Sequence, residues 1–334
     1  MEINSGFFSV TIWVTQVCNM RCTYCYEGSE KNHMSMSMQT AIQIVSWIVH
    51  YMDDNEYKYL LVRFHGGEPT LNIEIIEYIV NALNHTLEYK PYFEITSNGY
   101  GLSENTINYL CANIHEISIS IDGNKKWHDK NRKDLNGKGT FDSAMICADK
   151  ILRKKRDVII RMTVTPENVG LLYDDLKNLK TKGYRKFNIG PDIYSEKWNV
   201  YNLDNMVEQC RKIRQDLHDE FCDFSLPISE KVVKLPSCGG GYNSFNILPD
   251  GRIYPCIIAI EEKQCIGNVF EGIERNKLKE IRALIERPLQ TCETCKGYES
   301  CICVRCKFMN KKITGDYLKP VALFCELHRR SAWG

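Results

Sequence analysis

Residues 18–25 read CNMRCTYC, directly after an apolar, β-branched run at 8–14 that predicts a buried strand. The loop therefore carries Cys18, Cys22 and Cys25 with the spacing C-x3-C-x2-C. Three thiolates in one short loop can each bind one iron of a cubic [4Fe–4S] cluster, which leaves the fourth iron without a protein ligand. This open iron is the expected reactive position, because a substrate or cofactor can bind there.

The competing interpretation of the same loop is a tetrahedral zinc site completed by a distant ligand such as His33 or His65. A structural zinc site usually takes its ligands as two pairs, whereas these cysteines form an unpaired triplet at a strand end. We therefore favour the iron–sulfur cluster over zinc.

Outward from this loop, the chain alternates short β-rich runs with longer helical patterns. Strands are predicted at 8–14, 59–65, 92–96, 116–121, 158–165 and 186–189, and helices at 38–54, 73–88, 103–111, 141–155, 168–182 and 203–220. This alternation implies parallel strands joined by right-handed crossovers. It predicts an α/β fold in the form of a partial (β/α)6 barrel, with its reactive groups at the C-terminal ends of the strands.

The pattern changes near residue 215, after which the segments are short and cysteines crowd together. We predict a first domain at 1–215 and a second at 216–334, with a hairpin at 246–255 that turns at 249–251. Because the second part contains little apolar sequence, we expect metal sites to supply much of its stability.

The composition of the 334-residue chain excludes several classes of protein. Its 43% hydrophobic content supports a sizeable core, and its net charge of +1 argues against sequence-independent binding of nucleic acid. We find no export signal and no run of about 18 apolar residues, so we expect no membrane span. The 16 Cys then indicate a reducing, cytoplasmic environment. The basic runs at 153–156 and 307–312 are expected to be solvated surface.

The cysteine triplet, with Tyr24 before its last cysteine, resembles the cluster-binding motif of the radical S-adenosylmethionine (SAM) superfamily. A second resemblance follows the second predicted strand, where Gly66, Gly67, Glu68 and Pro69 match the GGEP loop of that family. In the family, the backbone and Glu of this loop receive the SAM amino group. Glycines suit such a position because a ligand must approach the backbone closely there.

Further matches to the family lie at later strand ends. Ser97 and Asn98 resemble the loop near the SAM adenosine, and Ser120 with Arg132 resembles the pair that holds the SAM carboxylate in peptide-modifying members. Arg161, on the fifth predicted strand, could reach the SAM ribose or carboxylate, or serve as a salt-bridged arginine of the barrel. The segment 128–141 also resembles anaerobic sulfatase-maturating enzymes and their relatives.

The C-terminal cysteines resemble the SPASM extension, the twin-cluster domain of radical SAM enzymes that modify peptides and proteins. By this resemblance, a nearer auxiliary [4Fe–4S] cluster takes Cys238, Cys256 and Cys306, and a farther one takes Cys292, Cys295, Cys301 and Cys325. One ligand of the nearer cluster stays unassigned, with Cys222 as the first candidate and Cys265 as the second. Cys303 competes with Cys306. The competing interpretation of the whole region is a zinc-ribbon-like domain, because C-x2-C pairs favour zinc on spacing alone.

The resemblance implies an enzyme that cleaves SAM at a reduced cluster and abstracts hydrogen from an unactivated carbon with the 5′-deoxyadenosyl radical. The expected substrate is a ribosomally made precursor peptide or protein, which would gain a thioether or carbon–carbon crosslink or another oxidative side-chain modification. The auxiliary clusters would accept the remaining electron. Sulfatase maturation is disfavoured, because Ile257 stands where those enzymes have an acidic residue.

Three alternatives stay open. A thiol such as Cys222 or Cys265 could return a hydrogen atom to the substrate and give an epimerase. The substrate could instead be a small molecule, or the chain could be a zinc-organised binding module.

The resemblance also implies partners. An electron donor such as flavodoxin or ferredoxin is expected to reduce the cluster that binds SAM. The first predicted strand begins within about eight residues of Met1, which leaves no room for a winged-helix recognition domain. The precursor would then be recognised by the barrel mouth, the bridging segment or a separate leader-binding protein.

Overall fold

The computed structural model describes residues 6–28, 32–155, 157–217, 222–224 and 238–333. The chain forms two compact units. Unit 1 comprises residues 1–21, 27–118 and 239–284, and unit 2 comprises residues 22–26, 119–238 and 285–334. The boundary cuts through the cysteine loop, so that Cys18 belongs to unit 1 and Cys22 and Cys25 belong to unit 2.

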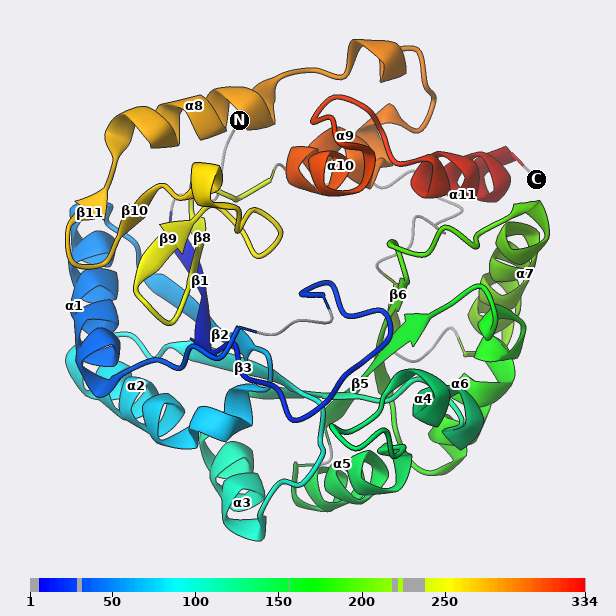
Figure 1. The fold of residues 1–334 in the computed structure, drawn as a ribbon, viewed down its shortest axis with the longest axis horizontal. Helices are drawn as coiled ribbons and strands as arrows, with labels where there is room; N and C mark the ends of the chain where they lie inside the picture. The colour runs from blue at the N-terminus through cyan, green and yellow to red at the C-terminus, as the bar shows by residue number, and fades with distance from the viewer. Residues whose placement is uncertain (1–5, 29–31, 156, 218–221, 225–237, 334) are drawn as a thin grey trace. The chain divides into compact units, whose positions relative to one another are not determined.

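Parallel strands form the centre of unit 1 (Figure 1). Strand β1 (Phe7–Thr15) pairs in parallel with β2 (Tyr59–Gly66) on one side and with β8 (Ser244–Ile247) on the other. β2 pairs in parallel with β3 (Tyr92–Ser97). The β-branched run of β1 is buried on both faces, as expected for a central strand of a parallel sheet.

The edge of unit 1 is antiparallel. β9 (Arg252–Tyr254) returns beside β8 as a hairpin, and β10 (Gly267–Asn268) and β11 (Gly272–Ile273) extend it. The strand order within this unit is β11-β10-β9-β8-β1-β2-β3.

Helices α1 (Met38–Asp54) and α2 (Ile73–Thr86) lie on the outer side of the strands of unit 1, and α3 (Glu104–Asn113) follows β3 (Figure 1). The sequence sets where two of them begin. Ser37 Oγ accepts a hydrogen bond from the Thr40 amide at 3.1 Å, and Ser103 caps α3 in the same way.

Unit 2 repeats the strand–helix pattern. β5 (Val158–Val164) pairs in parallel with β6 (Lys186–Pro191), and β6 pairs with β7 (Cys222–Phe224). The α-helices described in this unit are α4 (Lys125–Asn131), α5 (Phe141–Lys155), α6 (Leu172–Thr181), α7 (Val200–Leu217), α9 (Ile302–Arg305), α10 (Lys307–Thr314) and α11 (Ala322–Trp333). Of these, α5, α6 and α7 lie outside β5 and β6 in Figure 1.

Two elements straddle the boundary between the units, namely β4 (Glu116–Ser120) and α8 (Arg275–Glu286). The short 3₁₀ helices are η1 (Pro69–Asn72), η2 (Val169–Leu171), η3 (Glu262–Gln264), η4 (Gln290–Cys292) and η5 (Tyr298–Ser300).

The predicted α/β class with an open, mostly parallel sheet is confirmed, and the six predicted strands and six predicted helices are present. The hairpin turns between β8 and β9 as predicted. The pairing of β8 with β1 was not predicted, because a contact between segments so far apart in the chain leaves no local pattern. α4 was missed because its sequence, KKWHDKN, has no apolar stripe. The domain boundary near residue 215 stays a prediction.

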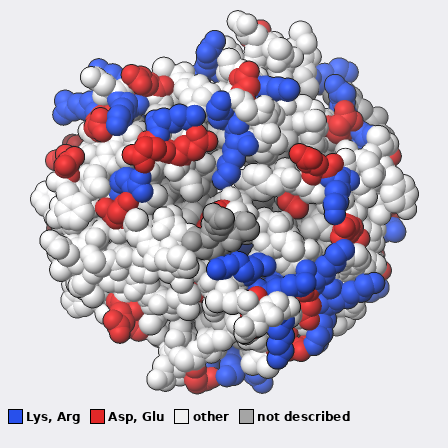
Figure 2. Space-filling view, in the orientation of Figure 1, with Lys and Arg blue, Asp and Glu red and all other residues white. Residues whose placement is uncertain are grey.

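Surface charge is mixed, as the composition implies. On the face in Figure 2, Lys and Arg side chains lie among Asp and Glu side chains. In the basic run 153–156, Arg153 and Lys154 are exposed as expected. The expectation is wrong for the run 307–312, because Lys307 is only 2% exposed. No helix in the described part of the chain has both the length and the apolar character to cross a membrane.

Two glycines bring the loop after β2 against the start of the cysteine loop. The amide of Gly67 donates to the carbonyl of Thr15 at 3.0 Å, and the next amide donates to the carbonyl of Val17 at 2.9 Å. Gly66 has a φ of +137°, and a Cβ there would lie 1.9 Å from the Thr15 oxygen. A Cβ on Gly67 would lie 2.4 Å from the Val17 oxygen. Backbone atoms therefore fill the space that a side chain would need.

We expect Gly67→Ala to lower the free energy of unfolding by about 3 kcal/mol, because the clash is with backbone atoms that cannot rotate away. The matched control is Gly101→Ala, where φ is +77° but the added Cβ meets nothing within 4 Å. That control should cost only about 1 kcal/mol. Urea unfolding of both variants tests the difference, and equal losses would contradict it.

Candidate active site

Cys18 is held within unit 1 by the loop that follows β3. Asn98 Nδ2 lies 3.9 Å from the Cys18 sulfur and donates to Asn19 Oδ1 at 2.8 Å. Arg21 Nη1 donates to the carbonyl of Cys18 at 3.3 Å. Asn98 is buried and Cys18 is half-buried. The thiol therefore has a defined position beside a polar amide.

Glu68 ties together two of the predicted cofactor loops. It is 1% exposed and accepts four hydrogen bonds, from the amide and hydroxyl of Thr70, the hydroxyl of Ser97 and the amide of Asn98, at 2.7–3.1 Å. Burial raises the pKa of Glu68, although these hydrogen bonds oppose the shift. Pro69 is buried at the first position of η1. The sequence predicts that Glu68 contacts the cofactor, but it does not predict this structural role. Two of its hydrogen-bond donors, Ser97 and Asn98, lie at the end of β3, about 30 residues away in the chain.

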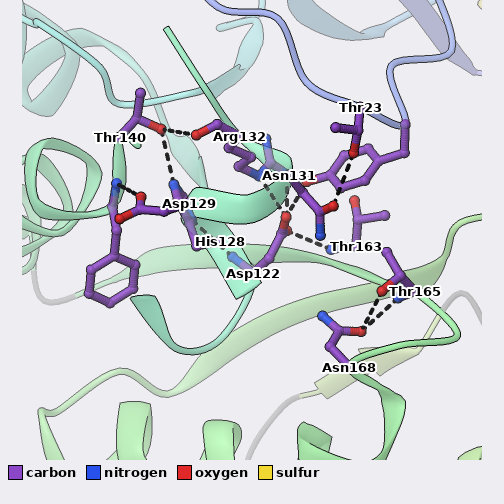
Figure 3. Close-up of polar contacts among 12 residues, drawn as sticks. Thr23, Asp122, His128, Asp129, Asn131, Arg132, Thr140, Thr163, Thr165 and Asn168 are labelled. Atoms are coloured by element: carbon purple, nitrogen blue, oxygen red, sulfur yellow. Dashed lines mark hydrogen bonds and ion pairs between the residues drawn. The ribbon is translucent and has the colours of Figure 1, made fainter. Parts of the chain in front are cut away.

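The second half of the cysteine loop is held within unit 2, where Thr23 meets Asn131 (Figure 3). The Thr23 amide donates to the Asn131 carbonyl at 2.9 Å, and the Thr23 hydroxyl donates to Asn131 Oδ1 at 3.0 Å. Tyr24 donates its hydroxyl to Asp122. Lys312 donates to the carbonyl of Tyr26 at 3.3 Å. The residues around Cys22 and Cys25 are thus fixed by contacts to α4 and α10.

Asp122 and Arg132 form a buried ion pair beside this segment (Figure 3). Arg132 Nε and Nη2 donate to the two carboxylate oxygens at 2.9 and 3.1 Å, and the Thr163 amide adds a third hydrogen bond at 2.9 Å. The guanidinium lies 5.4 Å from the centre of the Tyr24 ring. Burial disfavours the charge of Arg132, but Asp122, Tyr24 and Cys22 outweigh it and raise its pKa. A permanent positive charge therefore lies near the Cys22 thiol.

The remaining predicted SAM contacts are Ser120 and Arg161, which lie on β4 and β5. Ser120 is the last residue of β4 and is buried. Arg161 lies on β5 with an exposed side chain, and its carbonyl accepts from the amide of Ile121 at 3.0 Å. The sequence did not single out Asp122, although it follows Ser120 by two residues. Its burial after a strand end is visible only in the structure.

His128 contacts the backbone of Asp122 directly and that of Arg132 through the Thr140 hydroxyl. It is fully buried, its Nδ1 accepts from the Asp122 amide at 3.3 Å, and its Nε2 lies 3.1 Å from the Thr140 hydroxyl (Figure 3). Because that hydroxyl donates to the Arg132 carbonyl, it accepts from His128 Nε2–H. Burial, together with the charge of Arg132, lowers the pKa of His128 to about 4. His128 is therefore neutral near pH 7.

Four cysteines of unit 2 are electrostatic neighbours. Burial, together with the thiols of Cys301, Cys292 and Cys295, raises the pKa of Cys325 to about 11. A hydrogen bond from Cys303 lowers the pKa of Cys301 to about 6. These four are the predicted ligands of the farther auxiliary cluster, and their thiols lie close enough to influence the pKa of Cys325. Their joint ligation of a cluster stays a prediction.

The cysteines predicted for the nearer cluster fall in both units. In unit 2, burial raises the pKa of Cys306 to about 11, with Cys238 as a neighbouring thiol. The competitor Cys303 is fully buried, and its sulfur lies 3.8 Å from the Val321 carbonyl. In unit 1, Cys256 is half-buried and Cys265 donates to the Gly267 carbonyl at 3.3 Å. The side chain of Cys222, on β7, lies outside the described residues.

One buried polar group next to Cys306 in the chain lacks a partner within the part of the chain that the structure describes. Arg305 Nε is buried without a hydrogen-bond partner among the described residues. Such a donor, beside predicted thiolate ligands, fits an anionic group that is not part of the polypeptide. No group of three His, Cys, Asp or Glu within the described ranges is arranged to hold a single metal ion.

Comparison with known families gives two matches. The radical SAM superfamily matches residues 12–170, and an iron–sulfur cluster-binding domain called SPASM matches residues 238–296. The cysteine-type anaerobic sulfatase-maturating enzyme of Clostridium perfringens is 26% identical over 322 residues, which cover 87% of this chain and 86% of the relative. The sporulation killing factor maturation protein SkfB of Bacillus subtilis is 25% identical, with 79% and 62% covered.

Solved structures share the fold. The native anSMEcpe with bound AdoMet superposes with a TM-score of 0.81 at 22% identity, covering 97% of this chain and 95% of that one. Streptococcus suis SuiB bound to its precursor peptide SuiA gives a TM-score of 0.68 at 16% identity, with 96% and 76% covered. The predicted type of fold is thereby confirmed, whereas the assignment of individual ligands stays a prediction.

We expect His128 to make folding sensitive to acid. Its folded pKa of about 4 lies below the ordinary value of 6.5, so the unfolded chain binds the proton more tightly. The contribution of His128 to the free energy of unfolding is fully present above 6.5, its pKa in the unfolded chain. This contribution is lost as the pH falls from 6.5 toward the folded-state pKa of about 4. The loss is about 2 kcal/mol between pH ~7 and pH ~5.

Urea unfolding of His128→Gln at both pH values tests this prediction. The variant should be less stable than the wild type near pH 7 but should lose about 2 kcal/mol less on acidification. The matched control is His85→Gln on the exposed end of α2, which should follow the wild-type profile. An unchanged pH dependence in His128→Gln would refute the assignment.

Proposed function

Because the chain belongs to the radical SAM superfamily and carries a SPASM domain, we propose that it is a maturase of a ribosomally made precursor peptide. The observation that supports this proposal is the combination of an N-terminal cysteine triplet with the C-terminal cysteine sets, in one of which the thiols influence the pKa of Cys325. An enzyme that only needed to generate a radical would not require the second set.

The proposed cofactors are SAM and three [4Fe–4S] clusters. SAM and the cluster that binds it would supply a carbon radical that abstracts a hydrogen atom from the substrate, and the two auxiliary clusters would accept the remaining electron. Cys18, Cys22 and Cys25 are the proposed ligands of the cluster that binds SAM. The proposed auxiliary ligands are Cys238, Cys256 and Cys306 for the nearer cluster and Cys292, Cys295, Cys301 and Cys325 for the farther one, with Cys222 or Cys265 completing the nearer set. The orphaned donor of Arg305 supports an anionic occupant.

The proposed task of the polypeptide is to fix these groups in place. Glu68 holds the loops after β2 and β3 together. Glu68 and the backbone of Gly66 and Gly67 are the proposed contacts of the SAM amine. Arg132 is held by Asp122, which makes it a positioned positive charge for the SAM carboxylate, with Ser120 beside it in the chain. Ser97, Asn98 and Arg161 are the further proposed SAM contacts. A rigid, pre-oriented site limits side reactions of a radical.

The proposed substrate class rests on the relatives. SkfB is named as a maturation protein, and the SuiB structure contains a precursor peptide. We propose a thioether or carbon–carbon crosslink or another side-chain oxidation as the outcome. Sulfatase maturation is not proposed, even though a sulfatase-maturating enzyme is a relative, because Ile257 lacks the acid–base chemistry of a carboxylate. The proposed partners are a flavodoxin or ferredoxin as electron donor and, for recognition, a leader-binding protein.

The test is to incubate the anaerobically reconstituted full chain with SAM, a strong reductant and each small peptide encoded beside its gene. A crosslink is expected to remove two hydrogen atoms from the peptide, and a deuterated peptide should pass one deuterium to 5′-deoxyadenosine. Cys22→Ser should abolish both signals, whereas Cys111→Ser, a half-buried thiol on α3, should retain them.

Other outcomes separate the alternatives. Uptake of one solvent deuterium without loss of mass would indicate an epimerase. Release of 5′-deoxyadenosine that no peptide influences would indicate a small-molecule substrate. Zinc in place of iron and sulfide, with no cleavage of SAM, would indicate a zinc-organised binding module and refute the proposal.

A further inference from the structure

The segment that carries α4 has a local excess of positive charge. Residues 123–139 contain six Lys and Arg against two Asp, whereas the whole chain has 43 Lys and Arg against 42 Asp and Glu. Four exposed lysines of this segment form what we call the α4 surface, namely Lys125, Lys126, Lys130 and Lys138. In Figure 2, Lys and Arg side chains gather at the lower right, in the part of the view where Figure 1 labels α4 and α6.

Nearby acids offset only part of this charge. Lys125 and Lys130 each pair with one carboxylate, that of Asp142 and that of Glu167 respectively. The other two lysines of the α4 surface form no ion pair with a carboxylate in the described part of the chain. A molecule that approaches this part of unit 2 therefore meets a net positive field.

An aromatic ring lies among the ammonium groups. Trp127 is half-buried on α4, and the Nζ atoms of Lys126 and Lys130 lie 5.3 and 4.8 Å from the centre of its ring. These cation–π contacts restrict the positions of both lysines. Leu135, in the turn that follows α4, is 58% exposed. Aromatic and apolar side chains with charged groups around them are typical of a surface that binds another protein.

The N-terminal end of α4 is held in a fixed position. Asn124 Nδ2 donates to the two carboxylate oxygens of Asp175 at 2.9 and 3.1 Å, and Asn124 Oδ1 accepts from the Trp127 amide at 3.3 Å. Asp175 is 6% exposed, and a Cβ on Gly123 would lie 2.2 Å from its Oδ2. A surface on a helix that is fixed in this way needs little ordering when a partner binds.

The C-terminal end of α4 contacts the cysteine loop directly. Asn131, the last residue of the helix, accepts hydrogen bonds from the amide and the hydroxyl of Thr23 at 2.9 and 3.0 Å (Figure 3). Thr23 follows Cys22, a proposed ligand of the cluster that binds SAM, and Lys130 directly precedes Asn131. Covalent bonds and these hydrogen bonds therefore connect the α4 surface to the proposed cluster loop.

We propose that the α4 surface docks the electron donor, a protein whose redox group is surrounded by Asp and Glu side chains. The inference rests on the proposed function, in which the cluster of Cys18, Cys22 and Cys25 must be reduced before SAM is cleaved. One electron leaves the reduced donor, which is oxidised, and enters the oxidised cluster, while no bond forms or breaks. Opposite charges steer the two proteins together and orient the donor.

An acidic precursor peptide is the other occupant that this charge would suit. The exposed position of the α4 surface favours the electron donor, because a substrate must present a C–H bond inside the site. A donor only has to approach the cluster loop, and Asn131 joins that loop to α4.

The test is the initial rate of 5′-deoxyadenosine release by the anaerobically reconstituted full chain with each of two electron sources. One source is a reduced flavodoxin with an acidic surface, below saturation and at low salt. The other is reduced methyl viologen, a small cation that needs no docking surface. In Lys126→Glu with Lys138→Glu, the rate with flavodoxin should fall about tenfold, because the attraction becomes repulsion. The rate with methyl viologen should stay at the wild-type value.

The matched control is Lys58→Glu with Lys90→Glu, which makes the same change of charge at two exposed lysines that precede β2 and β3. It should keep the wild-type rate with both electron sources. A wild-type rate with flavodoxin in the α4 double variant, or an equal loss in the control, would overturn the inference and leave the proposed function intact. Wild-type protein that releases no 5′-deoxyadenosine with either source would instead overturn the proposed function.

Two further outcomes bear on the inference. A double variant that keeps the rate with flavodoxin, but converts the precursor peptide more slowly with methyl viologen, would assign the α4 surface to the precursor and overturn the inference. Should the charge reversal prevent folding, Lys126→Gln with Lys138→Gln removes the two charges without adding new ones. The rate with flavodoxin should then fall about threefold, and an unchanged rate would overturn the inference.

Discussion

The cysteine loop after β1 depends on contacts made by backbone atoms of other loops, because it has little regular secondary structure of its own. In unit 1, Gly66 and Gly67 approach the carbonyls of Thr15 and Val17 so closely that no side chain fits between them. In unit 2, Thr23 is hydrogen-bonded to Asn131 through backbone and side chain. Three thiols can bind one cluster only if the backbone that carries each cysteine is held in position. The proposed chemistry of the site therefore depends on these contacts.

Buried charges are the second organising feature, and each is explained by its surroundings. Glu68 is balanced by four hydrogen bonds, and Arg132 is balanced by Asp122. Removing one partner of such a buried pair costs about 3–5 kcal/mol, because the other charge is left uncompensated. Lys307 differs, since its ammonium donates to the Val304 carbonyl and forms no ion pair with a carboxylate among the described residues.

The sequence predicts the central features of the fold because they follow from local patterns. The alternating runs give β1 to β6 and the surrounding helices, and two short motifs point to the loops after β1 and β2. What the sequence misses depends on distant partners. The pairing of β8 with β1, the anchoring role of Glu68 and the network of Asp122, His128 and Arg132 join segments that are separated in the chain. The burial of Lys307 is misread because a run of basic residues is usually solvated.

The central claim is that Cys18, Cys22 and Cys25 hold a cluster whose fourth iron is open to SAM. Electron–nuclear double resonance on the reduced cluster, with SAM labelled with ¹⁵N in its amine and ¹⁷O in its carboxylate, measures this directly when the auxiliary ligands have been replaced. Our account predicts hyperfine coupling from both labels, which disappears in Cys25→Ala. A reduced cluster that shows no coupling to either label, or a single zinc ion held by these thiols, would contradict it.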